Sequence, residues 1–552
     1  MKKISKKLLC VLLAGMIGTA CVSCGPDKTS EESSGAEEST PKYTLDTYEF
    51  KQIASDGNTV TLNQYEENNP TANGFVEYSI FKQIKDKNYV KLDVETDVDL
   101  VGWIYYYNTA KPEETNAEKF FVEAGSTEFK MFLDGFRVGA RGAFDKTLTK
   151  ITFQNVDSTK VGTFTFKSLS VSDRSFDTNE DWRISNGDSI IGTKPFYGGC
   201  ITYLEKLNQD VCEYMDGAGN IVVDRDVCVD EVDLLSESVN LVNIYDLGRE
   251  IQPSYYANVT KENGYDPDYD PEDKDSYYQG LSGVPIYNPI QCGDFGGHTP
   301  QIIDYVYKEN YLYIKMKAQE WFFYTNIQAN GYIECTYYFD DGGAIMVDNV
   351  YTDFSQFYNL ENTSVRTQET PATYFIYPFN YFYCETKQGT IFDPNTAEQN
   401  GTNQGKASMR SQVTSAEYFY ALNGKNVVDD WCAFVNENKF GVGIFLPNAD
   451  NYIASRGRRS NSYNAEKLNH LYSDQFFSFG EDEIIPSYAA MNYSYINPAI
   501  NRKMVNFIPF EYTYALFIGD TTEMKSVFGE LRDSNTLTNE HLLDTTKGWP
   551  AK

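Results

Sequence analysis

The sequence YLYIKMKA at residues 311–318, followed by GYIECTYYF at 331–339 and FGVGIFLP at 440–447, decides the fold. These runs are rich in aromatic and β-branched residues and end at turn-forming residues, which is typical of β-strands. Neither an alternation of strands with amphipathic helices nor a GxGxxG motif occurs in this region. We therefore predict a large antiparallel sandwich and exclude a Rossmann fold or an α/β barrel.

The N-terminal part of the chain has a different pattern. In KLDVETDV (91–98) and TFTFKSLSV (163–171), apolar residues alternate with polar ones at Leu92, Val94, Phe164 and Phe166. A period of two gives a strand one buried and one solvated face, so residues 43–175 are predicted to form a jelly-roll-like β-sandwich. The segment FFVEAGSTEFKMFLDGF (120–136) resembles accessory modules of carbohydrate-active proteins, although a plain packing domain fits equally well.

One helix is expected near the C-terminus. Asp520 and Glu523 have the spacing of a capping box, and apolar residues then follow on one helical face at Met524, Val527, Phe528 and Leu531. Between the two β-rich regions, the polar and turn-rich stretch 175–188 is typical of a linker. The domain boundaries predicted are 43–175 and 186–535, with a C-terminal tail at 536–552.

The first residues resemble a secretory signal. Four lysines precede an apolar run from Leu8 to Ile17, which is too short to span a bilayer. Cys21 and Cys24 then stand where a bacterial lipobox places its acylated cysteine, and Cys24 is preferred because the polar tether 25–42 follows it. We expect residues 1–24 to be a lipoprotein signal, and the only membrane contact to be a lipid anchor on the outer face of the cell membrane. A cleaved signal without lipid is the alternative.

Composition narrows the possible partners. The formal net charge of −32 repels phosphate backbones, so nucleic acid is excluded as a partner. The chain has three histidines, and the seven cysteines beyond the export segment form no CxxC pair, which argues against a histidine metal centre or a zinc ribbon; no cofactor is expected. Asp266, Asp268 and Asp270 have the spacing of calcium ligands, but a solvated insertion loop is the preferred explanation, because Tyr277 stands where a glutamate would close an EF-hand.

Three segments combine polar side chains with glycines and aromatics. NLVNIYDLGREIQPSYY (240–256) and YNPIQCGDFGGHTP (287–300) supply loops in which the backbone can approach a ligand, and SVRTQETPATYF (364–375) precedes an aromatic stretch. A glycosidic transition state needs a proton donor, a carboxylate and an aromatic platform. The candidate catalytic residues are Glu369, Asp294 and His298. The candidate substrate-binding residues are Arg249, Asp246, Gln291, Arg366, Gln368 and Trp431, and Tyr255 and Tyr256 are candidates for stacking on a sugar ring. Ion pairs and hydrogen-bonded turns are the structural alternatives.

A resemblance rests on YDLGREIQPSYY, YNPIQCGD, RTQETPA and DDWCAFVNENKFGVGIFLP (429–447), in that order. Together they resemble a group of exported bacterial proteins regarded as glycan-acting, over about residues 190–535. GGCITYLEKL (198–207) is similar to the opening hairpin of galactose-mutarotase-like supersandwiches, which occur in epimerases, glycosidases and some polysaccharide lyases. The mutarotases' second histidine motif is missing here, which disfavours an epimerase.

The combined prediction is a cell-surface lipoprotein with an all-β architecture, an N-terminal jelly-roll-like sandwich followed by a supersandwich, that binds and hydrolyses a polysaccharide or oligosaccharide. Glu369 and Asp294 would act as the acid and its partner, His298 as a proton relay, and Arg249, Arg366 and Gln291 as orienting groups. A polysaccharide lyase and a non-catalytic glycan-binding lipoprotein are the alternatives. Two carboxylates in one pocket would favour the enzyme, and aromatics on an open face would favour the binder.

Overall fold

The computed structural model describes a β-rich chain. All described residues belong to one compact unit, residues 38–552. The structure describes residues 45–48, 51–52, 59–62, 75–85, 87, 89–108, 111–132, 145–156, 162–172, 181–207, 213–215, 221–223, 240–243, 250–258, 286–293, 300–321, 328–355, 365–375, 379, 381–393, 416–458, 492–534, 537 and 539. No helix among them is long and apolar enough to cross a membrane.

Two five-stranded antiparallel sheets form the N-terminal part. One has the order β1 (Leu45–Tyr48), β10 (Gly162–Ser172), β5 (Tyr89–Thr96), β8 (Glu128–Phe132), with β3 (Thr59–Leu62) also on β10. The other has the order β2 (Lys51–Gln52), β4 (Phe75–Lys85), β9 (Asp145–Asn155), β6 (Leu100–Asn108), β7 (Lys111–Val122). Residues of both sheets share one hydrophobic core, which contains Leu92, Val94, Phe164 and Phe166. The predicted alternation of buried and solvated positions is confirmed.

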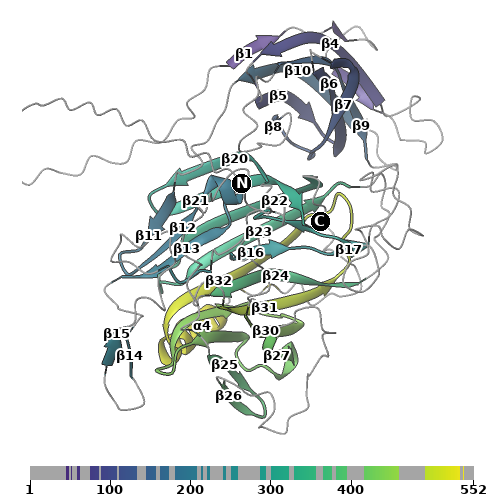
Figure 1. Ribbon diagram of the computed structural model, residues 1–552. Coiled ribbons are helices and arrows are strands. Elements are labelled where there is room, and N and C mark those ends of the chain that lie inside the picture. The colour runs from purple at the N-terminus through teal and green to yellow at the C-terminus, as the bar shows by residue number, and fades with distance from the viewer. Residues whose placement is uncertain are drawn as a thin grey trace, which may run out of the picture. The chain divides into compact units, whose positions relative to one another are not determined.

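A fifteen-stranded antiparallel sheet follows in the chain (Figure 1). Its order is β26 (Gly389–Asp393), β25 (Tyr381–Thr386), β28 (Trp431–Val435), β29 (Phe440–Phe445), β32 (Phe510–Asp520), β23 (Ile345–Asp353), β22 (Gln328–Phe339), β21 (Tyr311–Glu320), β19 (Pro289–Ile290), β16 (Gln252–Ser254), β24 (Arg366–Phe375), β31 (Asn492–Arg502), β30 (Asn451–Arg458), β27 (Ala416–Asn423), with β20 (Gln301–Lys308) also on β21. The three runs that predicted strands lie in β21, β22 and β29. The all-β class and the large antiparallel sheet are therefore confirmed.

Smaller elements accompany this sheet. A three-stranded sheet is made of β11 (Trp182–Ser185), β12 (Ser189–Thr193) and β13 (Ile201–Lys206), and the short pairs are β14 (Glu213–Met215) with β15 (Ile221–Val223) and β17 (Ala257–Asn258) with β18 (Ile286–Tyr287). Strand β11 begins inside the stretch 175–188 that was predicted as a linker. Its Trp182 is buried and stacks on Tyr305, with ring centroids 4.6 Å apart. At least the end of that stretch is thus part of the packed fold.

One core joins distant strands of the large sheet. Buried side chains from β22, β23 and β32 share a hydrophobic cluster with buried side chains from β24, β30 and β31. Strands that are far apart in the hydrogen-bonding order therefore bury apolar surface against one another. Such burial contributes roughly 25 cal/mol for each Å² of apolar surface removed from water, and it holds the central strands in place.

The predicted helix is present as α4 (Thr521–Asp533). The Asp520 side chain accepts hydrogen bonds from the backbone N–H groups of Thr522 and Glu523, and the Glu523 side chain accepts one from the N–H of Asp520, so the capping box is complete. Met524, Phe528 and Leu531 are buried against β29 and β32. Leu537, in the predicted tail, is also buried in this cluster.

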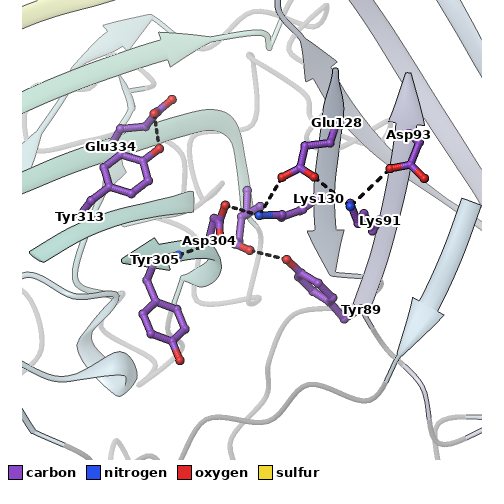
Figure 2. Close-up of polar contacts among 10 residues, drawn as sticks. Tyr89, Lys91, Asp93, Glu128, Lys130, Asp304, Tyr305, Tyr313 and Glu334 are labelled. Atoms are coloured by element: carbon purple, nitrogen blue, oxygen red, sulfur yellow. Dashed lines mark hydrogen bonds and ion pairs between the residues drawn. The ribbon is translucent and has the colours of Figure 1, made fainter. Parts of the chain in front are cut away.

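Side chains of β5 and β8 contact strand β20 of the large sheet (Figure 2). The Tyr89 hydroxyl donates to the carbonyl of Ile303 at 3.1 Å, and Lys130 Nζ lies 2.6 Å from an Asp304 carboxylate oxygen. Lys130 also pairs with Glu128 at 3.1 Å. Because these side chains keep part of their surface in water, each ion pair contributes about 1 kcal/mol.

A second contact joins β7 to the large sheet, and two of its groups have shifted pKa values. Lys317 Nζ lies 3.0 Å from a Glu118 carboxylate oxygen, and Lys119 Nζ donates to the Ser355 carbonyl at 3.2 Å. Asp353 accepts hydrogen bonds from the Ser355 N–H and hydroxyl, both at 3.1 Å. Burial raises the pKa of Asp353 to about 7, against the opposing effects of these bonds and the Lys119 charge, and burial lowers the pKa of Lys119 to about 7.

The Asp353 shift predicts a pH dependence of stability. The pKa of Asp353 is raised from 3.8 to about 7 in the folded state. In the pH window between these two values, the folded protein keeps a proton on Asp353 that the unfolded chain has lost. The stabilisation is complete below the unfolded pKa and disappears as the pH rises through the folded pKa. We expect Asp353→Asn to reduce the fall in the free energy of unfolding across this window, as measured by urea denaturation. An unchanged slope would show that Asp353 is already ionised.

Candidate functional site

Three neighbouring strands, β16, β24 and β31, bring Glu369 together with residues from distant parts of the chain. Ser254 on β16 and Ala499 on β31 lie directly opposite Glu369 in the ladder. The pairing of β24 with β31 shifts register between Glu369 and Thr373. Such irregularities re-aim side chains and are frequent next to active sites.

Tyrosines surround the Glu369 carboxyl group. The Tyr495 hydroxyl donates a hydrogen bond of 2.7 Å to Glu369 Oε1, and the rings of Tyr495 and Tyr374 have centroids 4.9 Å apart. Tyr256 also hydrogen-bonds the carboxyl group. As whole residues, Glu369, Tyr256 and Tyr374 are each half-buried, so protein covers most of this part of the sheet.

Burial determines the electrostatics of this site. It raises the pKa of the Glu369 carboxyl group, because desolvation disfavours the charged form, while hydrogen bonds from Tyr495, Tyr256 and Ser254 act in the opposite direction. Burial also raises the pKa values of Tyr256 and Tyr495 well above the ordinary tyrosine range. The carboxyl group can therefore hold a proton at a higher pH than an exposed glutamate, and the tyrosines remain protonated.

A buried polar network extends from this site to a second glutamate. Ser254 Oγ hydrogen-bonds Asn288 Oδ1 at 3.0 Å, and the N–H of Asn288 donates to both carboxylate oxygens of Glu320, each at 3.0 Å. The Trp321 N–H donates to the Asn288 carbonyl at 3.0 Å. Glu320 and Asn288 are buried, so they hold β19 and β21 in register beneath the half-buried group around Glu369.

Gln368 fixes the backbone of Tyr256. Its Oε1 accepts a 2.6 Å hydrogen bond from the Tyr256 N–H, and its Nε2 donates to the carbonyls of Tyr256 at 3.1 Å and Arg502 at 2.9 Å. Because Gln368 is fully buried and its amide binds main-chain groups, its contacts place it behind the site, as a residue that positions Tyr256.

The other predicted residues lie in different surroundings. Gln291 is buried and donates to the Tyr337 hydroxyl at 3.1 Å, while Trp431 is buried in the cluster beneath α4 and stacks on Tyr383. Arg366 is half-buried on β24, opposite Arg502. Asp246, Arg249, Asp294, His298, Cys21 and Cys24 lie outside the described residues, as do the acidic positions 266, 268 and 270. Their predicted roles remain predictions.

Of the tyrosine pair predicted to stack on a sugar, only Tyr256 is half-buried. Tyr255 is fully buried and stacks on Tyr351 at a centroid distance of 4.1 Å. Sequence reasoning missed Tyr495 and Glu320. Tyr495 lies 126 residues after Glu369 in NYSYINPAINR, and no local signal separates it from the many other strand tyrosines.

Comparison with known proteins gives little further information. No family model matches the chain, and no curated protein matches it. Among solved structures, the crystal structure of 4-α-glucanotransferase from Thermococcus litoralis matches with a TM-score of 0.25 and 11% identity, over 62% of this chain and 38% of that chain. The match thus covers well under two thirds of that protein. A likeness at this level is too distant to carry an argument about function, and the likeness to mutarotase-like supersandwiches stays a prediction.

Proposed function

We propose that this protein is a carbohydrate-active enzyme that hydrolyses a glycan, with Glu369 as the general acid. One observation carries the proposal: a carboxyl group with a raised pKa is held by tyrosine hydroxyls and bordered by tyrosine rings. A general acid must hold its proton near the working pH, and burial is a common way to achieve this. Tyr256 and Tyr374 beside it are partly exposed and offer a surface on which a sugar can stack.

The proposal also assigns roles to four other residues. Asp294 would be the second carboxylate, His298 a proton relay, and Arg249 and Arg366 the groups that orient the sugar. A lyase that uses tyrosine as its base has less support, because burial raises the pKa values of Tyr256 and Tyr495 and makes their ionised forms costly.

A polysaccharide panel tests the activity. The protein is incubated with neutral and acidic plant and host polysaccharides, and the products are analysed for new reducing ends and for ultraviolet-absorbing unsaturated ends. We expect new reducing ends without ultraviolet absorbance. Unsaturated products would identify a lyase, and binding without any product would identify a glycan-binding protein; either result overturns the hydrolase proposal.

Export and lipid anchoring at Cys24, or at Cys21, belong to the same proposal. Replacing both cysteines by alanine should release the protein from the membrane fraction, because no acylation site remains and a single acyl-bearing cysteine is the only anchor expected. Cys10→Ala, inside the apolar run, is the matched control and should leave the protein membrane-bound. Recovery of the double variant with the membranes would place the tether elsewhere.

A further inference from the structure

Two thiols and a carboxylate meet in the protein interior. Cys200, Glu250 and Cys292 each offer one ligand atom, and these three atoms all lie within 4.8 Å of one another. The Cys292 thiol donates to Glu250 Oε2 at 2.8 Å. All three residues are fully buried, although they come from three separate segments of the chain.

Backbone contacts hold these three residues in place. Ile201 and Ile251 form an isolated antiparallel bridge with N–H to carbonyl distances of 3.1 and 3.2 Å, which holds the segment that carries Cys200 against the segment that carries Glu250. The Cys292 N–H donates to Gln252 Oε1 at 2.7 Å, which ties the third residue to the segment that carries Glu250.

The turn before Cys200 is also tightly packed. Gly199 has a left-handed φ of 71°, and a Cβ at this position would lie 2.2 Å from Ile314 Cδ1. Only glycine therefore fits there without a shift in the surroundings. The ligand atoms are thus brought together by the fold itself and not by flexible surface side chains.

Gln291, which precedes Cys292 in the chain, offers a fourth group that can bind a metal. Gln291 is fully buried; its Nε2 donates to the Tyr337 hydroxyl at 3.1 Å and to the Gly198 carbonyl at 3.4 Å. Its Oε1 has no hydrogen-bond partner among the described residues. The Gly198 carbonyl that this amide contacts stands two residues before Cys200, so the amide lies close to the segment that carries this thiol. A buried amide oxygen without a donor is costly, and it can accept a metal instead.

We propose that Cys200, Glu250 and Cys292 bind a zinc ion, with Gln291 Oε1 as the fourth ligand. Thiolate ligands select zinc over calcium or magnesium, and a closed, buried set of four protein ligands is typical of a structural site. On binding, each thiol loses its proton to solvent and a sulfur–zinc bond forms, without any change of oxidation state. Zinc–ligand bonds of about 2.0–2.3 Å would require the 2.8 Å thiol–carboxylate contact to lengthen modestly.

The proposed ion would stabilise the strands that carry the candidate site. Ser254 follows Glu250 by four residues, and Asn288 precedes Cys292 by four, so the ion would join β16 to β19 behind the network under Glu369. The inference does not rest on the proposed hydrolase activity. The spacing of residues in the sequence does not indicate this zinc site, because its ligand residues are separated by tens of residues.

Metal content tests the proposal on the full chain. Protein purified without chelators should contain about one zinc per chain, and its zinc X-ray absorption spectrum should show two sulfur ligands at about 2.3 Å. Cys200→Ala and Cys292→Ala should each lower the zinc content to about a tenth or less of this value, because a zinc site that loses one thiolate binds far more weakly. Cys432→Ala is the matched control, since Cys432 is also a buried free thiol, and it should retain zinc.

Wild-type spectra keep the test valid if the alanine variants fail to fold. Wild-type protein without zinc after growth in zinc-supplemented medium, or a spectrum that lacks sulfur ligands, would overturn the proposal. So would a peptide map that shows a Cys200–Cys292 disulfide, because the same two sulfurs cannot then act as thiolate ligands.

Discussion

Glu369→Gln should lower the rate of glycan cleavage by about 10²- to 10⁴-fold, which is the usual contribution of a positioned general acid. Glutamine keeps the shape of the side chain and can still accept the 2.7 Å hydrogen bond from Tyr495. It cannot deliver a proton to the leaving oxygen. Glycan binding should therefore persist while turnover is lost, as measured by reducing-end assays alongside binding titrations on the substrate identified by the panel.

The stability of this variant separates a catalytic from a structural role. The pKa of Glu369 is raised in the folded state, so its favourable contribution is complete below the unfolded carboxyl pKa and is lost as the pH rises through the folded value. Glutamine has no such loss. The melting temperature of Glu369→Gln at neutral pH should equal or exceed that of the wild type. A strongly lowered melting temperature would mean that a charged Glu369 is needed for packing, and we would withdraw it as the acid.

Glu334→Gln is a suitable control for this experiment. Glu334 lies on β22 of the same sheet and accepts a 2.6 Å hydrogen bond from the Tyr313 hydroxyl, so it reproduces the tyrosine–glutamate contact outside the candidate site (Figure 2). Its replacement should leave cleavage unchanged. Equal losses in both variants would point to a general effect on the sheet, and normal cleavage by Glu369→Gln would remove Glu369 from the mechanism.

Local patterns in the sequence predicted local structure well. Alternation placed Leu92 and Phe164 in the core of the N-terminal sheets, and the spacing of Asp520 and Glu523 located the start of the helix. Both signals depend on residues a few positions apart, where the period of the chain decides which side chains share a face.

The candidate site was predictable only in part, because strand pairing is long-range. Glu369 was identified from its motif, but Tyr495 reaches it only through the pairing of β24 with β31. The same limit applies to the Cys200, Glu250 and Cys292 cluster, which no local spacing indicates. Trp431 was predicted to bind substrate, but it lies in the core under α4. The local sequence around an aromatic strand residue does not reveal whether its ring faces a ligand or the core.

The packing beneath α4 predicts the largest loss of stability. The Phe528 ring lies 5.6 Å from that of Phe445, 5.7 Å from Trp431 and 6.4 Å from Phe517, centroid to centroid. Phe528→Ala removes a fully buried ring and leaves a cavity that the surrounding strands can fill only in part. We expect it to lower the free energy of unfolding by about 3–5 kcal/mol, as measured by chemical denaturation.

Two further variants make this prediction specific. Val527 precedes Phe528 on the same helix but is only partly buried, so Val527→Ala should cost far less. A Cβ added at Gly443 on β29 would lie 2.8 Å from Phe528 Cε2 and 2.9 Å from the Met524 sulfur, and Gly443→Ala alone should therefore destabilise by overpacking. In the Phe528→Ala background this clash with the ring disappears and the methyl group enters the cavity, so the double variant should lose less stability than the sum of the two single losses. A Phe528→Ala loss no greater than that of Val527→Ala, or strictly additive losses, would show that Phe528 does not fill the space between α4 and β29.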